Sequence, residues 1–115
     1  LIENVVSNYL SNALHHTGEG GTVRIAFTPL ANGRCRLSVF NSGRNIPQEA
    51  LSRIWEAFYK VDKARTRAYG GSGIGLSVVA AIMEAHHQAY GVQNHPGGVE
   101  FYCELPFAQK AELPQ

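Results

Sequence analysis

The order of three short segments constrains this chain most. Residues 8–13 hold a polar helical stripe, residues 41–46 hold a turn with an amide side chain, and residues 71–76 hold regularly spaced glycines. Each segment alone is weak, because amides and glycines also serve ordinary turns. Packing requirements alone rarely produce all three in this order, so we predict that the segments contribute to one binding site.

Residues 1–16 carry apolar side chains at helical spacing, which predicts an amphipathic helix. At about 100° per residue, Asn4, Asn12 and His15 fall within roughly 40° of Asn8, so the four residues form a polar stripe on the other side of the helix. Asn is a poor helix former, and a solvated face more often carries Glu, Lys, Gln or Arg. Amide oxygens suit a hard cation such as Mg²⁺, and amides also hydrogen-bond phosphate oxygens. A merely solvated stripe is the alternative for this helix alone.

Four strand-like runs follow a hairpin pattern. Residues 22–30 and 34–41 flank an Ala-Asn-Gly turn, and residues 89–94 and 99–105 flank a His-Pro-Gly-Gly turn. We predict two β-hairpins.

The second of these runs ends at a polar turn. Its alternation of Cys35, Leu37 and Val39 with polar residues predicts one face packed on helices. Asn41 follows at the strand end, where its amide oxygen could accept a hydrogen bond from the exocyclic amine of adenine. An Asn chosen for turn geometry explains this segment equally well.

The middle of the chain changes character twice. Pro47 and residues 48–50 predict a helix start, and Leu51, Ile54, Trp55 and Phe58 form an apolar stripe typical of a core. Residues 61–72 are then basic and glycine-containing, without an apolar period. We interpret them as a mobile lid over phosphates. A solvated surface loop is the alternative.

Glycines at 71, 73 and 75 lead into a strongly helical run at 76–85. Without side chains the backbone can approach a polyphosphate closely, and the N–H groups at a helix start favour negative charge. The spacing excludes both the Rossmann glycine pattern and the P-loop.

Composition sets the remaining limits. The chain has 115 residues, 44% of them hydrophobic, which fits a single domain over residues 1–115. A formal net charge of +1 gives no bulk attraction to nucleic acid or to an anionic membrane surface. Cys35 and Cys103 have neither metal-ligand spacing nor a disulfide framework, so we expect a reduced, cytoplasmic setting. The chain begins within a helical pattern and without Met, from which we expect a piece of a longer protein.

Together these segments resemble the catalytic, ATP-binding domain of bacterial two-component sensor histidine kinases, within the GHKL ATPases. The resemblance covers residues 2–106. Its four motifs are Asn8-x-x-x-Asn12-Ala13 (N box), Asn41-x-Gly43-x-x-Ile46-Pro47 (first glycine box), residues 55–60 (F box) and Gly71-x-Gly73-x-Gly75-Leu76 (second glycine box). The resemblance implies an α/β (α+β) two-layer sandwich. A mixed, mostly antiparallel sheet would be packed on one face by about three helices, with an ATP lid at 60–72.

The resemblance also implies residue roles. Asn12 would bind Mg²⁺, Asn8 would help to hold the metal or the phosphates, and Asn41 would meet adenine. Lys60 would reach the terminal phosphate and, with the two helix amides, form the catalytic set. Phe58 would anchor the base of the lid. The other implied nucleotide contacts are His15, His16, Gly43, Ile46, Tyr59, Gly71, Ser72, Gly73, Ile74, Gly75 and Leu76. The implied reaction moves the γ-phosphoryl group of ATP to a histidine nitrogen, mainly through positioning and charge neutralisation.

Four positions depart from the family pattern. His15 and His16 stand where a Lys and an aromatic residue are common, so a fixed charge near the phosphates becomes pH-dependent, and we expect activity to rise in mild acid. Asn41 replaces the more usual Asp, which predicts looser base selectivity. Lys60 stands where Arg is frequent and loses a bidentate phosphate contact.

The family places a dimerising helical hairpin with the phosphoacceptor histidine, and usually a strand, before this domain. Neither occurs in residues 1–115. By resemblance we expect a homodimeric, membrane-anchored sensor whose cytoplasmic catalytic domain makes no direct membrane contact, meets the dimerisation domain and serves a response regulator. We expect the fragment to bind ATP without efficient autophosphorylation, and to have an exposed sheet edge.

Within the family, sensors of the cell envelope or of antibiotics in Gram-positive bacteria, including the glycopeptide-resistance type, look most similar. Two other functions stay open. One is a GHKL serine kinase or hydrolytic ATPase. The other is a pseudokinase that binds nucleotide and only relays a conformational signal, which the four departures His15, His16, Asn41 and Lys60 would permit.

Overall fold

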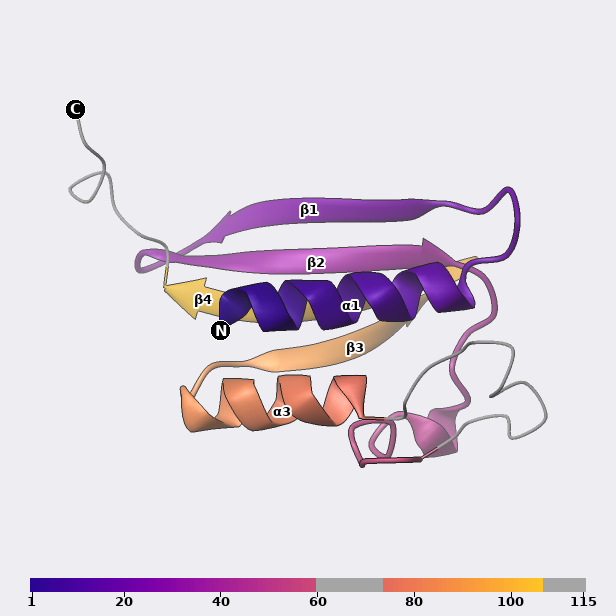
Figure 1. The fold of residues 1–115 in the computed structure, drawn as a ribbon. Coiled ribbons are helices and arrows are strands. Elements are labelled where there is room, and N and C mark those ends of the chain that lie inside the picture. The colour runs from indigo at the N-terminus through magenta and orange to yellow at the C-terminus, as the bar shows by residue number, and fades with distance from the viewer. Residues whose placement is uncertain (60–73, 107–115) are drawn as a thin grey trace.

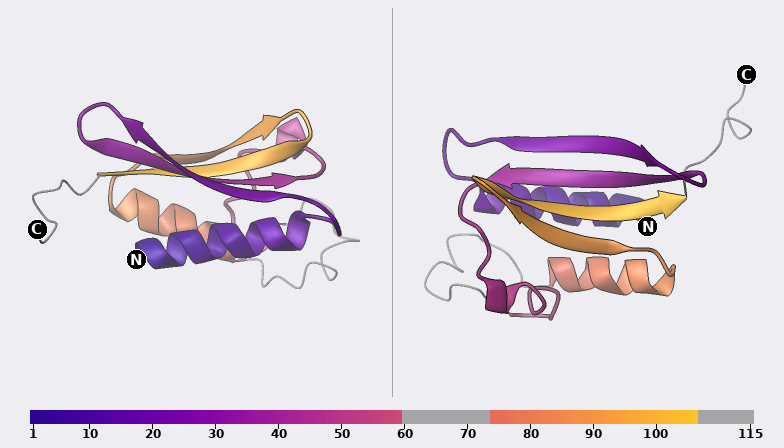
Figure 2. Two further views of the ribbon diagram at one scale, coloured as in Figure 1. Left: turned by 90° about the horizontal axis from the view of Figure 1, so that it is seen from above. Right: turned by 180° about the vertical axis from the view of Figure 1, so that it is seen from behind.

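The computed structural model describes residues 1–59 and 74–106. Two α-helices, α1 (Ile2–His16) and α3 (Gly75–Ala85), lie on one face of a four-stranded sheet (Figures 1 and 2). The predicted lid at 60–72 lies outside the described residues, as do Lys60, Gly71, Ser72 and Gly73. The expected two-layer α/β architecture is confirmed.

Both predicted hairpins are present. β1 (Val23–Leu30) pairs with β2 (Arg34–Ser42), and β3 (Tyr90–His95) pairs with β4 (Gly98–Pro106). The second hairpin joins the first through β2 and β4, which gives the strand order β1-β2-β4-β3. Every pairing among these four strands is antiparallel, so the described part of the sheet contains no parallel pair.

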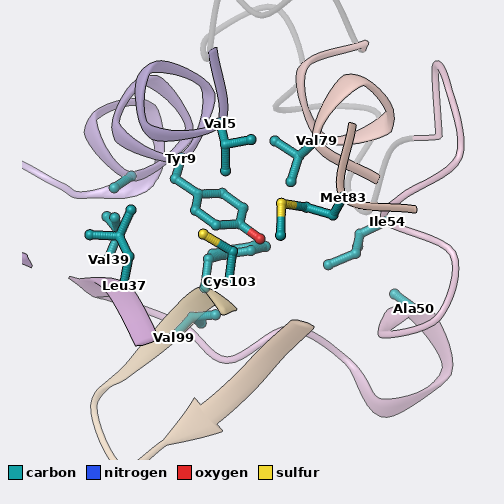
Figure 3. Close-up of a cluster of buried hydrophobic side chains, with 12 residues drawn as sticks. Val5, Tyr9, Leu37, Val39, Ala50, Ile54, Val79, Met83, Val99 and Cys103 are labelled. Atoms are coloured by element: carbon teal, nitrogen blue, oxygen red, sulfur yellow. The ribbon is translucent and has the colours of Figure 1, made fainter. Parts of the chain in front are cut away.

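The core lies between the sheet and the helices (Figure 3). Its central side chain is Tyr9 of α1, which is fully buried and packs on Phe101 with 5.5 Å between ring centroids. The alternation predicted for β2 is confirmed, since Cys35, Leu37 and Val39 are all buried. Helix α3 contributes Val79 and Met83, and β4 contributes Val99, Phe101 and Cys103. Burial of each large apolar side chain stabilises such a core by about 1.5–3 kcal/mol.

The segment after β2 is less helical than the sequence predicts. A single 3-10 turn, η1 (Gln48–Ala50), stands where a helix start was expected, and turns continue through residue 58. Ile54 is buried as predicted, but the expectation that Phe58 packs in the core is wrong, because its side chain is 64% exposed. Its backbone has a φ of 66°, in the left-handed region, and this local reversal removes it from the apolar stripe.

The helix layer does not reach the edge strand β1. Ile25 and Phe27 lie opposite the buried Val39 and Leu37, and therefore face the helix side of the sheet. They are nevertheless 49% and 66% exposed, because no described element covers them. An open apolar groove of about 710 Å³ runs between this strand and the side of α1 that carries Val6 and Leu10. The edge strands of the described sheet are β1 and β3.

The two cysteines are free and buried. Burial, with smaller effects from Cys35 and Glu104, raises the pKa of the Cys103 thiol to about 11, so it stays protonated at neutral pH. In the part of the chain that the structure describes, neither helix has the length and apolar character needed to cross a bilayer.

Candidate nucleotide-binding site

Two helices meet at Asn8 and Gly75. The side chain of Asn8 donates from Nδ2 to the backbone carbonyl of Asn4, at 2.8 Å. This bond turns Oδ1 toward the first residue of α3, where a methyl group added to Gly75 would lie 2.9 Å from that oxygen. The N box and the second glycine box of the sequence are therefore in direct contact, and a side chain larger than glycine at position 75 would have to displace the Asn8 amide.

Helix α3 begins at this contact. Its N-cap is Ile74, without a side-chain cap, and its first turn contains no acidic residue. Amide N–H groups at a helix start lack intrahelical acceptors and favour an anion. Gly75 keeps the backbone accessible there. The local chemistry therefore fits a phosphate group better than a cation.

The C-terminal end of α1 lies beside the turn that follows β2. A methyl group on Gly43 would lie 3.6 Å from the backbone carbonyl of His16 and 3.9 Å from Nδ2 of Asn41. In Figure 1 this end of α1, the start of α3 and the end of β2 share one side of the molecule. The fold thus brings the described parts of these three segments to one side of the molecule.

The orientation of the Asn41 amide is set by its neighbour. Asn41 is 3% exposed, and its Nδ2 donates to the backbone carbonyl of Ser42 at 3.2 Å. Oδ1 is left as the group available to a ligand. An acceptor at this position suits the exocyclic amine of adenine.

The turn after Asn41 is fastened to the β3–β4 hairpin by residues that the sequence analysis did not select. Asn94 accepts from the backbone N–H of Ile46 through Oδ1 and donates to the carbonyl of Ile46 through Nδ2, both at 2.9 Å. Asn45 donates from Nδ2 to the carbonyls of His95 and Gly98, also at 2.9 Å. The only sequence signal for Asn94 is an Asn inside a strand, where Asn is disfavoured.

The other predicted contact residues differ in how far they are exposed. His15 and His16 are exposed in the last turn of α1, and Asn12 is partly buried one turn after Asn8. Tyr59 is partly buried under the guanidinium of Arg53, 4.6 Å from its ring centre. Ile46 and Leu76 pack on the core, and Ile74 is 40% exposed. Lys60 and residues 71–73 fall outside the described part, so their roles stay predictions.

The donor atoms at the site determine which metal ion it could hold. Within residues 1–59 and 74–106 no group of three or more His, Cys, Asp or Glu side chains could hold a metal. Asn8 and Asn12 supply neutral oxygens only, one helical turn apart on the same stripe. Mg²⁺ commonly takes few protein ligands and completes its shell with phosphate oxygens and water. The amide pair therefore fits Mg²⁺ that arrives with a polyphosphate.

Comparison with known proteins identifies the family. Residues 1–109 match the model of the family described as histidine kinase-, DNA gyrase B- and HSP90-like ATPases. The chain belongs to this ATPase family. Sensor protein VanSB of Enterococcus faecalis is 42% identical over 106 residues, which are 92% of this chain and 24% of that protein. The chain thus spans about a quarter of that relative's length.

Solved structures place this ATPase domain with histidine kinases. Full-length ShkA in complex with AMPPNP aligns with a TM-score of 0.77 and 34% identity, over 93% of this chain and 21% of that one. Histidine kinase ThkA in complex with the response regulator protein TrrA aligns with a TM-score of 0.74 and 30% identity, over 93% and 28%. The domain is therefore a GHKL-type ATPase domain of the sensor histidine kinase kind.

Proposed function

We propose that this domain binds Mg²⁺-ATP and transfers the γ-phosphoryl group to a histidine in the dimerisation domain of the same sensor kinase. That histidine would then supply a response regulator. The observation that carries the proposal is the contact between Asn8 and Gly75, which joins an amide stripe to a glycine-led helix start. Amide oxygens and free N–H groups are the complementary partners of a metal-bound polyphosphate.

The phosphate end of the site would be formed by α1 and α3. N–H groups at the start of α3 would hold phosphate oxygens, while Asn8 and Asn12 would hold the metal and orient the phosphate chain. Bound Mg²⁺ would supply charge neutralisation of the phosphates. Lys60 would add a positive charge near the terminal phosphate, by resemblance to the family. Transfer itself would depend on this positioning, because phosphoryl transfer needs little covalent assistance from the protein.

The adenine end would be formed at the turn after β2. Oδ1 of Asn41 would accept from the exocyclic amine, since Nδ2 is already engaged by the carbonyl of Ser42. Adenine preference is then expected despite the departure from Asp. Guanine presents a carbonyl oxygen at the corresponding position and would face the Asn41 oxygen unfavourably.

The relatives support the wider setting. ShkA is in complex with AMPPNP, an ATP analogue, and ThkA is in complex with a response regulator protein. VanSB is a sensor protein. We infer that the present domain faces the cytoplasm, where ATP is available, within a homodimeric sensor anchored to the membrane.

A calorimetric titration with AMPPNP, with and without Mg²⁺, tests nucleotide binding. We expect Mg²⁺-dependent binding that Asn12→Ala weakens at least about tenfold, a loss of roughly 1.4 kcal/mol. Ser11→Ala is the matched control, because the neighbouring Ser11 is exposed on α1. A folded wild-type domain that binds no nucleotide would refute the proposal.

The transfer step needs a separate assay. The domain is mixed with the histidine-bearing helical hairpin of its own full-length protein and with ATP labelled at the γ-phosphate. Label that is stable to alkali and lost in acid is expected, since this behaviour marks phosphohistidine. Binding without transfer would favour the pseudokinase, and acid-stable label would favour the serine kinase.

A further inference from the structure

The β3–β4 hairpin carries none of the nucleotide motifs of the sequence, yet it makes several hydrogen bonds to the turn that follows Asn41. We propose that Asn94 of β3 is a positioning residue that, together with Asn45, sets the base selectivity of the nucleotide site. This inference rests on the proposed function and names residues through which the site is held in shape.

The amide of Asn94 completes a two-way backbone pairing. Its Oδ1 accepts from the N–H of Ile46 and its Nδ2 donates to the C=O of the same residue, each at 2.9 Å. The side chain therefore acts as a neighbouring strand would, on a segment that has no regular secondary structure. Both polar atoms of the amide are used, so neither a carboxylate nor an apolar side chain can reproduce the pairing.

Asn45 and Gly43 add bonds from the turn to the hairpin. Nδ2 of Asn45 bridges the carbonyls of His95 and Gly98, and the N–H of Gly43 donates to the carbonyl of Gly97 at 2.9 Å. The turn is thus fastened near its beginning by backbone and near its end by Asn94. The β2–β4 ladder ends at the pair Ser42 and Gly98, and beyond it side-chain amides make the hydrogen bonds between the turn and the hairpin.

The fastened turn begins two residues after Asn41. Gly98, opposite Ser42, leaves no room for a side chain, because an added methyl group would overlap the Phe40 ring and the Asn41 carbonyl. The hairpin therefore packs directly against the backbone of Asn41. A shift of the hairpin or of the turn would move the Asn41 oxygen relative to a bound base, and hydrogen-bond discrimination is lost with small displacements.

The substitution that tests the role is Asn94→Asp. It keeps the size of the side chain but places a carboxylate oxygen against the carbonyl of Ile46. Gln93→Glu is the matched control, since it makes the same change of charge one residue earlier on the strand, at an exposed position. Both variants change the net charge of the domain by the same amount.

Titrations with AMPPNP and GMPPNP give the functional readout. For wild-type protein and Gln93→Glu we expect the same preference for the adenine analogue. For Asn94→Asp we expect the ratio of the two affinities to fall at least fivefold, while the Mg²⁺ dependence of binding is retained. Equal weakening of both analogues, with the ratio unchanged, would mean that Asn94 has only a structural role and would overturn the inference.

Amide hydrogen exchange provides a readout without nucleotide. In Asn94→Asp the N–H of Ile46 should exchange at least tenfold faster than in Gln93→Glu, while the N–H groups of the β2–β4 ladder should be unchanged. An unchanged exchange rate of the Ile46 N–H would show that Asn94 does not hold the turn in place. If Asn94→Asp shows faster exchange at Ile46 but the wild-type protein binds no nucleotide, the proposed function is refuted, and base selectivity along with it.

Discussion

The phenol of Tyr9 donates a hydrogen bond to the backbone carbonyl of Tyr102 at 2.8 Å, and so ties α1 to β4 through the centre of the core. Tyr9 is fully buried (Figure 3). Burial, reinforced by Cys103 and the neighbouring tyrosines, raises the pKa of this phenol well above its ordinary range, so it remains a donor at all physiological pH values. The helix that carries the amide stripe is positioned from its opposite face by this bond.

Tyr9→Phe is expected to lower the free energy of unfolding by about 1 kcal/mol, the usual net contribution of a single hydrogen bond. Urea denaturation measures the change, with an unaltered m-value. Tyr90→Phe serves as the control, because the Tyr90 hydroxyl pairs with Glu84 at the surface and should contribute about half as much or less. Equal losses in the two variants would contradict a special role for Tyr9.

Gly75→Ala separates stability from binding. Ala is the better helix former by up to about 1 kcal/mol, so unfolding should be little affected or slightly harder. The added methyl group would displace the Asn8 side chain from its position over the α3 start, and AMPPNP affinity should fall at least about tenfold. Gly18→Ala is the control, since nothing lies within 4 Å of a methyl group there. Unchanged affinity in Gly75→Ala would show that the Asn8 contact is not part of the site.

Asn41→Ala should reduce base discrimination more than it reduces overall affinity. Its Oδ1 is the acceptor that the base would use, and a site built to hydrogen-bond one group discriminates strongly against a ligand without it. We expect wild-type protein to bind AMPPNP at least about tenfold tighter than GMPPNP, and the variant to bind both with similar affinity. Parallel titrations of the two analogues measure this. Equal wild-type affinities would place the base elsewhere.

The stability of the fold should depend on pH through Glu100, which lies on the open face of the sheet. Burial opposes its ionisation, but hydrogen bonds from His95 and Ser38 and the charges of His95 and Arg36 outweigh burial and lower its pKa from the ordinary 4.5. Because the folded-state pKa lies below the unfolded value, ionised Glu100 stabilises the fold above about pH 4.5. This contribution is lost as the pH falls through the folded-state value.

Glu100→Gln should therefore lower the free energy of unfolding at pH 7 by about 1 kcal/mol, a modest value because the partner His95 is partly exposed. Denaturation curves at several pH values should show the gap to wild type closing below pH 4.5. Glu19→Gln, at an exposed loop position, provides the control and should leave the curves unchanged. A gap that is constant down to pH 3 would exclude ionisation as its cause.

Local patterns were sufficient for most elements of this fold, but not for the segment after β2. The amphipathic period of residues 1–16, the turn glycines of both hairpins and the alternation along β2 each act over a few residues, and the structure has α1, two hairpins and a buried β2 face as expected. The prediction for Phe58 was wrong because it relied on a local pattern alone. Its apolar spacing was read as helical, whereas a left-handed backbone at Phe58 interrupts that spacing and turns the ring outward.

Most of the elements and the order of the three motif segments thus follow from the sequence, because propensity and periodicity are properties of neighbouring residues. Which of these segments touch depends on the packing of the folded chain. Gly75 reaches Asn8 because both helices pack on the same sheet face, and Asn94 reaches Ile46 because β3 and the turn after β2 meet across 48 residues of chain. Such contacts depend on strand order and on the packing of whole elements, which no local pattern encodes.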